Sequence, residues 1–599
     1  MENLIKTNHI RNFTIIAHVD HGKSTLADSI LMLCGAISAR EYKNQLLDSM
    51  SIERDRGITI KAQTVRLQWK DHILNLIDTP GHSDFAYEVS RSLHACEISI
   101  LLIDATKGVE AQTISNLKNA QQAGHFIIPV LNKIDLPTAN INSCYEAIDN
   151  LGLDINMVHE VSAKTGAGVE KLLESIIRYG PCPKTTLNET RALIVDSWYD
   201  KYLGVVTLVR MIDGKITEGQ KVKSCSNDKN FNVLKVGVFT PEPKQIKELS
   251  AGEIGYVVTQ VKIATEIHVG DTFIGNLSSA PALEGFQKVK PVVFCTFYPE
   301  NPEEADFVHD CLKKYVLNDS GFCFTVEHSD IYGMMFLCGF LGLLHLEIVK
   351  ERLELEFEVF VVVTMPTVIY RVKLKTNDNI LEINNANKWP VQCDIEYMEE
   401  PEAFCTIYVG KELGKVSTLC VNRRAEEIDI KQIEERFIIT CKIPLSEIIV
   451  DFFDELQSLT SGYASFEYTQ CGFRQSTMDK IIILVNDEII KEFGLIVHSS
   501  KAMAVGKNLV EKLKEIIPQA QIPIKIQAAV NSKTNIVARS TISPFRKDVT
   551  AGLYGGDITR KNKHLDRQKK GKSRMLSMSR SHILNRIPKN SIRDLLKIN

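Results

Sequence analysis

The 599-residue sequence lacks any apolar run long enough to cross a bilayer, any C-x-x-C pair and any secretory leader. The first absence excludes an integral membrane protein that crosses with helices. The 14 cysteines are scattered singly, which excludes a zinc layout and a small disulfide framework and indicates reduced thiols. The N-terminal stretch MENLIKTNHIRNFTIIAH also lacks the composition of a transit peptide, so we expect the protein to stay in the compartment where it is made.

An even distribution of charge is also missing. The net charge is −3, but residues 533–599 contain 17 Lys and Arg against 4 Asp and Glu, which gives +13 for this segment and −16 for the remainder. Such an asymmetry indicates a polyanionic partner for one end of the chain. The composition, 44% hydrophobic and 24% charged, is that of a globular protein, and the length favours about three to five domains.

Alternating apolar runs organise the chain. Over roughly the first 180 residues the runs NFTIIAHV, HILNLIDT, ISILLIDAT and HFIIPVLNK alternate with helical patterns, which predicts a parallel sheet with crossover helices. Closely spaced strand patterns then predict a small β-barrel over residues 190–283. Strands and amphipathic helices, among them LHLEIVKERL and PLSEIIVDFFDELQSL, predict two α+β units over 290–369 and 392–480, followed by a mixed region that ends in the basic segment.

The first glycine of a phosphate-binding loop is missing from the stretch AHVDHGKST. The general pattern is G-x-x-x-x-G-K-[ST], and here Ala17 takes the first position while Gly22, Lys23 and Ser24 supply the rest. Backbone N–H groups of such a turn bind phosphate oxygens, the lysine adds positive charge and the serine can hold a magnesium ion. Alone, this fragment also fits an ordinary helix start.

Three further motifs follow in order, each after a strand pattern. In DTPGH, Asp78 can hold the metal through water and the Gly81 N–H can meet a terminal phosphate. In NKID, Asp135 can pair with both N–H donors on the edge of guanine, one of which adenine lacks. SAK offers the Ala163 N–H to the guanine oxygen. Each motif is weak alone, but the ordered set predicts a guanine-nucleotide site.

A sensor of the terminal phosphate is expected at Thr59 in ERDRGITIKA, whose hydroxyl can complete the metal shell, although Thr59 can also simply begin a strand. The expected cofactors are therefore GTP or GDP and Mg²⁺. The predicted nucleotide-binding residues are Asp20, His21, Gly22, Lys23, Ser24, Thr25, Gly81, Asn132, Lys133, Asp135, Ser162, Ala163 and Lys164, and the predicted metal ligands are Ser24, Thr59 and Asp78.

These motifs resemble those of the translational GTPases, and an alanine at the position of Ala17 is typical of their LepA group, also called elongation factor 4. The blocks LLDSMSIERDRGITIKAQTVRL, CGFLGLLHLEIVKERLE, DFFDELQSLTSGYASFEY and LYGGDITRKNKHLDRQKKGKSRM extend the resemblance over almost the whole chain. Elongation factor G has a long extra domain between its two α+β units, for which this chain has no room. The BipA group lacks the YGGDITRKNKHLDRQKKGKSRM ending.

The resemblance implies a multidomain α/β and β fold with two ferredoxin-like α+β domains. The expected domains are a P-loop GTPase α/β domain (1–183), a translation-factor β-barrel (190–283), a ferredoxin-like α+β domain (290–369), an α+β domain like domain V of elongation factor G (392–480) and a LepA-type C-terminal domain with a basic tail (481–599).

The resemblance also implies a mechanism. His82 resembles the catalytic histidine that positions the attacking water, and Asp20 matches a loop aspartate that organises the phosphates and the histidine. Val19 and Ile58 resemble the apolar gate that holds the histidine away. No arginine finger is evident in the sequence, so the implied activity is ribosome-activated GTP hydrolysis, with the sarcin-ricin loop of the large-subunit RNA supplying the missing organisation. The implied role is backward movement of tRNAs on elongating or stalled ribosomes, which supports translation under stress.

The basic segment is expected to bind RNA, because neutralising phosphates with cations makes binding strong and salt-dependent. The alternative is a solvated, disordered tail. Tyr554 is the nearby aromatic, so base stacking is not predicted. The resemblance implies tRNA contact, a cytoplasmic monomer and peripheral contact with the cytoplasmic face of an anionic membrane. The predicted RNA-binding residues are Arg560, Lys561, Lys563, Arg567, Lys569, Lys570, Lys572 and Arg574.

Some positions depart from the group. Leu203, Leu337 and Ser461 stand where arginine is usual, and we expect them on RNA-facing surfaces where they weaken ribosome binding. His345 is expected to be a structural histidine. Two other interpretations remain open: a GTP-switched ribosome-assembly or RNA-binding factor, and a guanine-nucleotide regulator without a ribosomal partner, against which the charge of the tail argues.

Overall fold

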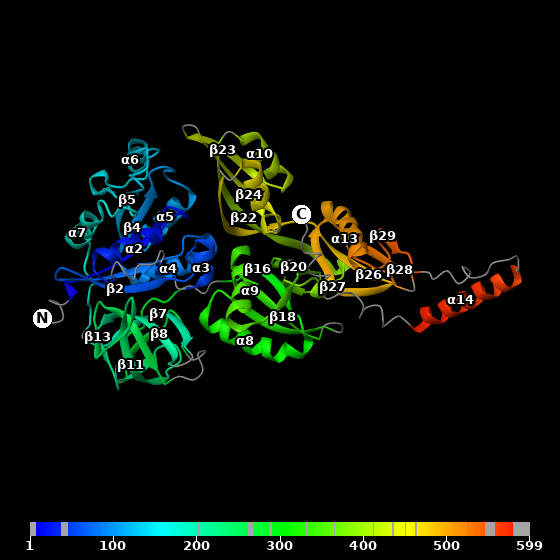
Figure 1. Cartoon of the computed structure of the whole chain (residues 1–599), viewed down its shortest axis with the longest axis horizontal. Coiled ribbons are helices and arrows are strands. Elements are labelled where there is room, and N and C mark those ends of the chain that lie inside the picture. The colour runs from blue at the N-terminus through cyan, green and yellow to red at the C-terminus, as the bar shows by residue number, and fades with distance from the viewer. Residues whose placement is uncertain are drawn as a thin grey trace.

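The secondary-structure elements form successive units along one long axis, with the N-terminal units at one end and α14 at the other (Figure 1). The structure is a computed structural model. It describes residues 7–37, 46–48, 50–187, 189–200, 203–260, 267–276, 278, 280–286, 290–329, 333–364, 366–375, 377–410, 412–433, 436–449, 451–461, 464–520, 523–545 and 558–578.

The first unit is a six-stranded sheet in the order β2-β3-β1-β4-β5-β6, with helices on both faces. Its strands are β1 Ile10–Ala17, β2 Gln63–Trp69, β3 His72–Asp78, β4 Ile98–Asp104, β5 Phe126–Asn132 and β6 His159–Glu160. Its helices are α2 Lys23–Leu33, α3 Ser51–Arg56, α4 Ala86–Ala95, α5 Ala111–Gln122, α6 Ile141–Asn150 and α7 Val169–Tyr179. The sheet is parallel as predicted, except that β2 runs antiparallel to β3.

Burial on both faces explains why the strands of this sheet are almost continuously apolar. In β1, Phe13 and Ile15 enter the core beneath α2 and α7, while Ile16 enters the opposite core beneath α4, α5 and α6. The parallel strands β1, β3, β4 and β5 all end at one edge, and each of the predicted motifs follows one of these ends or β6. The sheet thereby gathers the motifs at that edge.

The second unit is a closed barrel, because β10 pairs with both β15 and β11 and completes the ring β10-β15-β7-β8-β14-β11. Its apolar interior contains Ile194, Val209, Val257 and Phe273. Its strands, including the short ones outside the ring, are β7 Arg191–Asp200, β8 Gly204–Asp213, β9 Lys215–Thr217, β10 Lys221–Ser224, β11 Asn230–Thr240, β12 Glu242–Ile246, β13 Glu248–Ser250, β14 Ile254–Thr259 and β15 Thr272–Gly275.

Two α+β units follow. The first has the sheet order β17-β18-β16-β19, and the second has the order β21-β20-β22-β24-β23 with β25 also paired to β22. The elements of the first are β16 Val293–Pro299, α8 Ala305–Asn318, β17 Cys323–Ser329, β18 Gly333–Phe340, α9 Leu343–Phe357 and β19 Val361–Val363. The elements of the second are β20 Tyr370–Leu374, β21 Asn377–Ile383, β22 Ile395–Val409, α10 Leu413–Asn422, β23 Glu426–Ile433, β24 Arg436–Pro444, α11 Leu445–Ile449, α12 Phe452–Thr460 and β25 Ser465–Gln475.

Two details of the second α+β unit differ from the sequence patterns. The stretch that passes from one unit to the other contains the hairpin β20–β21, which extends the sheet through β22. The amphipathic pattern PLSEIIVDFFDELQSL forms two helices, α11 and α12, instead of one. As a result Phe452 is fully buried, whereas Phe453 is half exposed.

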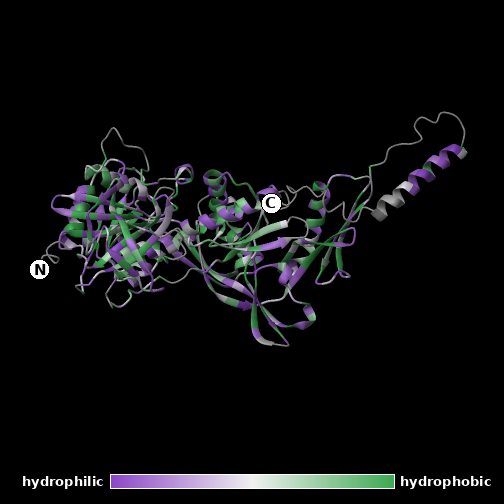
Figure 2. Cartoon of the chain, turned by 90° about the horizontal axis from the view of Figure 1, so that it is seen from below, coloured by the Kyte–Doolittle hydropathy of each residue, from purple (hydrophilic) through white to green (hydrophobic). Residues whose placement is uncertain are grey.

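The last sheet has the order β27-β26-β28-β29 and packs against α13. Its elements are β26 Met478–Val485, β27 Glu488–His498, α13 Ala502–Ile516, β28 Ile524–Val530 and β29 Ile536–Ile542. Beyond it, the hydrophilic helix α14 Ile558–Met578 projects away from the body (Figure 2). None of the helices in the described ranges combines the length and the apolarity needed to cross a membrane. The multidomain α/β and β architecture predicted from the sequence is confirmed.

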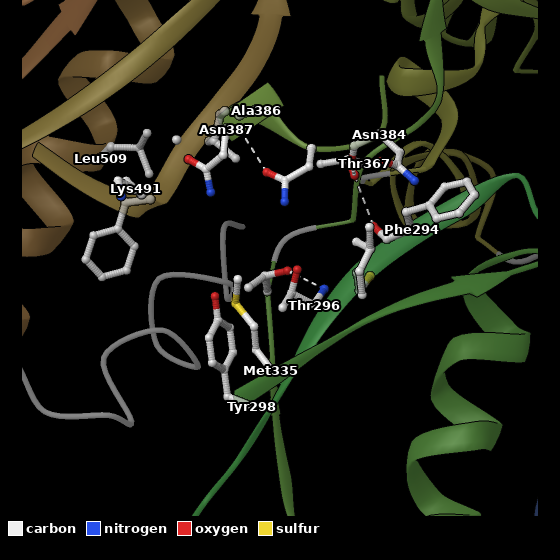
Figure 3. Close-up of a pocket in the computed structure, with 17 residues that line it drawn as sticks. Phe294, Thr296, Tyr298, Met335, Thr367, Asn384, Ala386, Asn387, Lys491 and Leu509 are labelled. Atoms are coloured by element: carbon white, nitrogen blue, oxygen red, sulfur yellow. Dashed lines mark hydrogen bonds between the residues drawn. The ribbon is translucent and has the colours of Figure 1, made fainter. Parts of the chain in front are cut away.

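A cavity of about 70 Å³ lies where the first α+β unit, the segment 384–387 and the last sheet meet (Figure 3). Thr296, Tyr298 and Met335 reach it from β16 and β18, and Leu509 reaches it from α13. Leu337 also lines this cavity and is only 6% exposed. The prediction that Leu337 lies on an RNA-facing surface is therefore wrong, because its strand faces another unit of the same chain.

Candidate functional site

A second cavity, of about 230 Å³, opens at the edge of the first sheet where β1 and β3 end. Three loop segments and Lys133 surround it, so the fold brings together stretches that lie far apart in the sequence. The lining residues are His18, Val19, Asp20, Gly22, Lys23, Ser24, Thr25, Gly57, Ile58, Thr59, Gly81, His82 and Lys133.

The loop before α2 explains why one glycine of the phosphate-binding pattern is kept and the other is absent. Gly22 caps α2 at φ 89°, and a Cβ on it would lie 2.6 Å from Nδ2 of Asn132, so both backbone and space require glycine. Ala17 is the buried last residue of β1, where an alanine fits an extended strand. The loop also bends through Asp20 at φ 66°.

Lys23 stands at the centre of a buried polar group. Its Nζ donates to Oδ1 of Asp78 at 2.8 Å and to the Thr59 hydroxyl at 2.9 Å. The Thr59 hydroxyl lies 3.4 Å from that of Ser24 and donates to Oδ1 of Asp48 at 2.9 Å. Thr59 lies in a loop ahead of β2, so it does not begin a strand. The three predicted metal ligands therefore converge on one point.

Asp48 is a site residue that the sequence patterns missed. Burial raises the pKa of its carboxyl and the nearby Asp78 raises it further, while Lys23 and the Thr59 hydroxyl lower it. Asp48 precedes Thr59 by 11 residues and belongs to none of the four motifs, so only the fold of this loop brings it to the site.

The donor set fits a magnesium ion. Hydroxyl and carboxylate oxygens are the ligands this ion prefers, usually few in number and completed by water and substrate phosphates. Among the described residues no group hydrogen-bonds to Oδ2 of the fully buried Asp78. The described residues include no group of three or more His, Cys, Asp or Glu side chains that could hold a metal ion.

The predicted base-recognition motifs meet through Asn132. Its Nδ2 donates to the His21 carbonyl at 2.9 Å, and its Oδ1 accepts from the Ala163 N–H at 2.9 Å. Lys133 donates to the Asp20 carbonyl at 2.7 Å and forms an ion pair with Asp104. Ser162 is buried beside Ala163, while Asp135 and Lys164 are exposed next to the motifs that contain them.

The two loop histidines differ in position. The His21 ring is fully buried and contacts Glu110 at 2.8 Å, so only the backbone of His21 can face a phosphate. His18 lines the cavity, and burial lowers its pKa to about 4, opposed in part by Glu110. Glu110 and Gln112, which accepts from the Val19 N–H at 3.3 Å, are further residues that no motif indicated.

His82 lies at the cavity rim with the two predicted gate residues. Its Nδ1 accepts from the Asp84 N–H at 3.1 Å, so the proton of the neutral ring resides on Nε2. Val19 adjoins Gly81, since a Cβ on Gly81 would lie 3.5 Å from a Val19 methyl carbon. Ile58 packs against Ile52, Phe85 and other apolar neighbours. The histidine and the gate thus share one rim.

The predicted RNA-binding cations lie on α14. The sequence pattern predicts no helix for this segment, because the segment has no apolar face. Arg560, Lys563, Arg567 and Lys570 recur every three or four residues and so share one face of the helix. The exposed side chains are Arg560, Lys561, Lys563, Arg567, Lys569 and Lys570, whereas the side chains of Lys572 and Arg574, and the whole of Tyr554, lie outside the described residues.

The remaining unusual positions also have places in the fold. Leu203 packs against Val206, Tyr256 and Val258 of the barrel, which accounts for an apolar side chain there. Ser461 is exposed and ends α12 at φ 53°. His345 is fully buried with Nε2 3.0 Å from Asp319, as expected of a structural histidine.

Three family models match separate parts of the chain. The Elongation factor Tu GTP binding domain matches residues 8–182, the Elongation factor G C-terminus matches 397–482 and the GTP-binding protein LepA C-terminus matches 485–596. A crystal structure of a protein from Thermus thermophilus is similar in fold, with a TM-score of 0.58 over 78% of this chain and 97% of that chain, at 16% identity.

The first match covers the sheet that carries the nucleotide motifs, and it defines a GTPase of the translation-factor class. The elongation factor G and LepA matches cover the second α+β unit and the region beyond it. This combination of domains is consistent with a translational GTPase of the LepA, or elongation factor 4, type.

Proposed function

We propose that the protein is a ribosome-activated GTPase that acts on elongating or stalled ribosomes and promotes backward movement of tRNAs, supporting fidelity and efficiency under stress. The observation that carries the proposal is the joint presence of a cavity walled by the phosphate-binding loop and both neighbouring loops, and a LepA-type C-terminus with an exposed basic helix. The same chain can therefore bind a nucleotide at one end and a polyanion at the other.

The residues around the cavity have distinct proposed roles. The loop Asp20–Thr25 and Gly81 bind the phosphates of GTP through backbone N–H groups. Lys23 binds them through its ammonium group, which requires it to exchange its contact with Asp78 for phosphate. Ser24, Thr59 and Asp78 hold Mg²⁺, which when bound neutralises charge on the phosphates. Asn132 and Lys133 support the loop, while Asp135 and the segment Ser162–Lys164 recognise guanine.

His82 is the proposed catalytic residue, with Asp20 supporting it. The hydrogen bond from Asp84 to Nδ1 leaves Nε2–H free to be aimed at an attacking water. Val19 and Ile58 keep the ring at the rim until contact with the sarcin-ricin loop moves it inward. Because no arginine of the described chain lines the cavity, intrinsic hydrolysis is expected to be slow.

The basic helix α14 and the tail beyond it are proposed to contact tRNA and ribosomal RNA. Exposed cations on a helix bind a phosphate backbone by charge and read RNA by shape. The same positive charge also favours peripheral contact with the cytoplasmic face of an anionic membrane. Apart from this contact, we propose that the protein is a monomer in the cytoplasm.

Steady-state GTP hydrolysis with and without intact 70S-type ribosomes, at two salt concentrations, tests this proposal. Strong stimulation that falls with salt is the expected result. Stimulation by free subunits instead of whole ribosomes would favour an assembly factor. GTP binding without any stimulation would favour a regulator that has no ribosomal partner.

A further inference from the structure

The side chain of Asp84 lies at the N-terminus of α9, in a different unit from its own backbone. The His345 N–H, in the first turn of α9, donates to Oδ2 of Asp84 at 3.3 Å. Asp84 is nearly buried there, and the helix N-terminus favours a negative charge. The carboxylate therefore caps a helix of the first α+β unit from the GTPase domain.

Gly342 makes room for this carboxylate. A Cβ on Gly342 would lie 2.2 Å from Oδ2 and 2.3 Å from Oδ1 of Asp84. The backbone of Gly342 is extended, with φ −169°, a conformation that any residue adopts. The requirement for glycine at this position thus comes from Asp84 and not from the backbone.

The backbone of Asp84 contacts His82. The Asp84 N–H donates to Nδ1 of His82 at 3.1 Å, and Oδ1 of Asp84 approaches the same nitrogen at 3.7 Å. Because the backbone N–H already donates to Nδ1, the longer approach is not a second hydrogen bond. One residue therefore connects the rim of the nucleotide cavity to α9.

The residues that follow Asp84 also contact the first α+β unit. Phe85 is fully buried against Ile348 of α9, and the Tyr87 hydroxyl donates to Oδ1 of Asp319 at 3.2 Å. Burial alone would raise the pKa of Asp319, but His345 beside it holds that pKa well below its usual range, so Asp319 stays charged. Arg91 also hydrogen-bonds to Ser320.

Helix α3, which directly precedes the loop Gly57–Thr59 on the opposite side of the cavity, contacts α9 as well. Arg56 forms ion pairs with Glu347 and Glu351 of α9, each at 2.9 Å, and Ile52 packs in the same cluster as Ile348. Helix α9 thus contacts the helix that precedes the loop of Thr59 and the residues that follow His82. Its position and the positions of these segments are mechanically linked.

We propose that Asp84 is a positioning residue for His82, and that its seat, formed by Gly342 and the His345 N–H, couples the orientation of the first α+β unit to GTP hydrolysis. The inference rests on the proposed catalytic function of His82. A shift of α9 would pull on the Asp84 carboxylate and thereby turn the segment that carries His82.

Gly342→Ala tests the seat, because the added methyl group occupies the position of the carboxylate. We expect the kcat of ribosome-stimulated hydrolysis to fall about 10- to 100-fold, the scale of an Å-sized misplacement of a catalytic group. KM for GTP and the affinity for GDP should stay unchanged, a split that general misfolding would not produce. Gly410→Ala is the matched control, since nothing lies within 4 Å of its Cβ position.

Asp84 variants complete the test. Asp84→Ala should lower kcat as Gly342→Ala does, Asp84→Asn should retain more activity because its Oδ1 can still accept from His345, and the double variant Asp84→Ala/Gly342→Ala should be no slower than Asp84→Ala alone. A wild-type rate in Gly342→Ala, or losses that multiply in the double variant, would overturn the proposal.

Amide hydrogen exchange of residues 82–91, measured without ribosomes, separates this inference from the proposed function. Faster exchange in Gly342→Ala than in wild type and Gly410→Ala is expected. Unchanged exchange would reject the seat even if ribosomes stimulate hydrolysis. Faster exchange in a protein that ribosomes do not stimulate would instead reject the proposed function and leave the seat as a contact between units.

Discussion

At the scale of single residues, the choice of base is assigned to one exposed carboxylate, Asp135. Asp135→Asn replaces two acceptor oxygens by one acceptor oxygen and one donor amide group. This pair matches the N–H and the carbonyl oxygen of xanthine better than the two N–H donors of guanine. Each lost charge-assisted hydrogen bond should weaken GTP binding by about 1.5–3 kcal/mol. Displacement of a fluorescent nucleotide by GTP and by xanthosine triphosphate measures the preference. Asp149→Asn, an exposed carboxylate on α6, should change neither affinity, and unchanged GTP preference in Asp135→Asn would refute the assignment.

His82 provides a second prediction at this scale. His82→Ala should bind GTP as wild type does, because the proposed phosphate contacts come from the loop Asp20–Thr25 and from Lys23, but its ribosome-stimulated turnover should fall by about 10²- to 10⁴-fold. Single-turnover hydrolysis with saturating ribosomes measures this loss. His94, on the same segment as His82, contacts Ser90 and the distant Phe286, and His94→Ala should retain full stimulation. Full activity in His82→Ala would exclude the catalytic role.

At the scale of elements, α14 should govern the salt dependence of ribosome binding. Removing two phosphate contacts with Lys563→Ala/Arg567→Ala should reduce the slope of log affinity against log salt by about 1.4 to 1.8. The matched control is Lys507→Ala/Lys514→Ala, which removes the same charge from exposed positions of α13. Ribosome pelleting at several salt concentrations gives the slopes, and equal slopes for the two double variants would reject α14 as the RNA contact.

Prediction of elements from the sequence succeeded where burial dictates the pattern. The strands β1, β3, β4 and β5 are apolar because both faces of their sheet are covered, and the motifs follow the ends of β1, β3, β5 and the short β6. The hairpin β20–β21 was missed because its apolar residues do not alternate cleanly: Tyr370, Val372 and Ile383 are buried, whereas the adjacent Ile380 and Leu381 lie partly in solvent. Helix α14 was missed because none of its described side chains belongs to an apolar core, so its sequence has no apolar stripe.

The nucleotide site was predictable for those residues that lie in motifs at the ends of buried strands, but not for residues that only the fold brings to the site. Motif residues follow strand ends, so a parallel sheet gathers them. Asp48 and Asp84 were not found, because the first depends on the fold of a loop and the second on contact with another unit. Leu337 was misplaced for a related reason: its strand faces the last sheet, which nothing in its local sequence indicates.

At the scale of the whole molecule, a buried charge network joins the second α+β unit to the last sheet. Arg424 holds Glu400 with two hydrogen bonds of 2.7 and 2.9 Å and holds Glu447 at 2.9 Å, while Lys501, just before α13, pairs with Glu447 from the other side. Burial by itself raises the pKa of Glu400, but Arg424 outweighs it and lowers that pKa. Glu400 is fully buried, and its charge is compensated mainly by Arg424, with one further hydrogen bond of 3.1 Å from Arg474.

Arg424→Leu removes two hydrogen bonds to Glu400 and one to Glu447 and leaves Arg474 as the remaining guanidinium at Glu400, so it should destabilise this unit by about 3 kcal/mol, the lower end for a broken buried pair. Trp389 is buried against Tyr370 of the same sheet, and it is one of only three tryptophans, so with Trp69 and Trp198 replaced by Phe its fluorescence follows the urea unfolding of this unit. Lys415→Leu removes an exposed pair with Glu412 in the same unit and should cost no more than about 1 kcal/mol. Equal losses in the two variants would show that Arg424 contributes no more than a surface ion pair, and that apolar packing alone holds the units together.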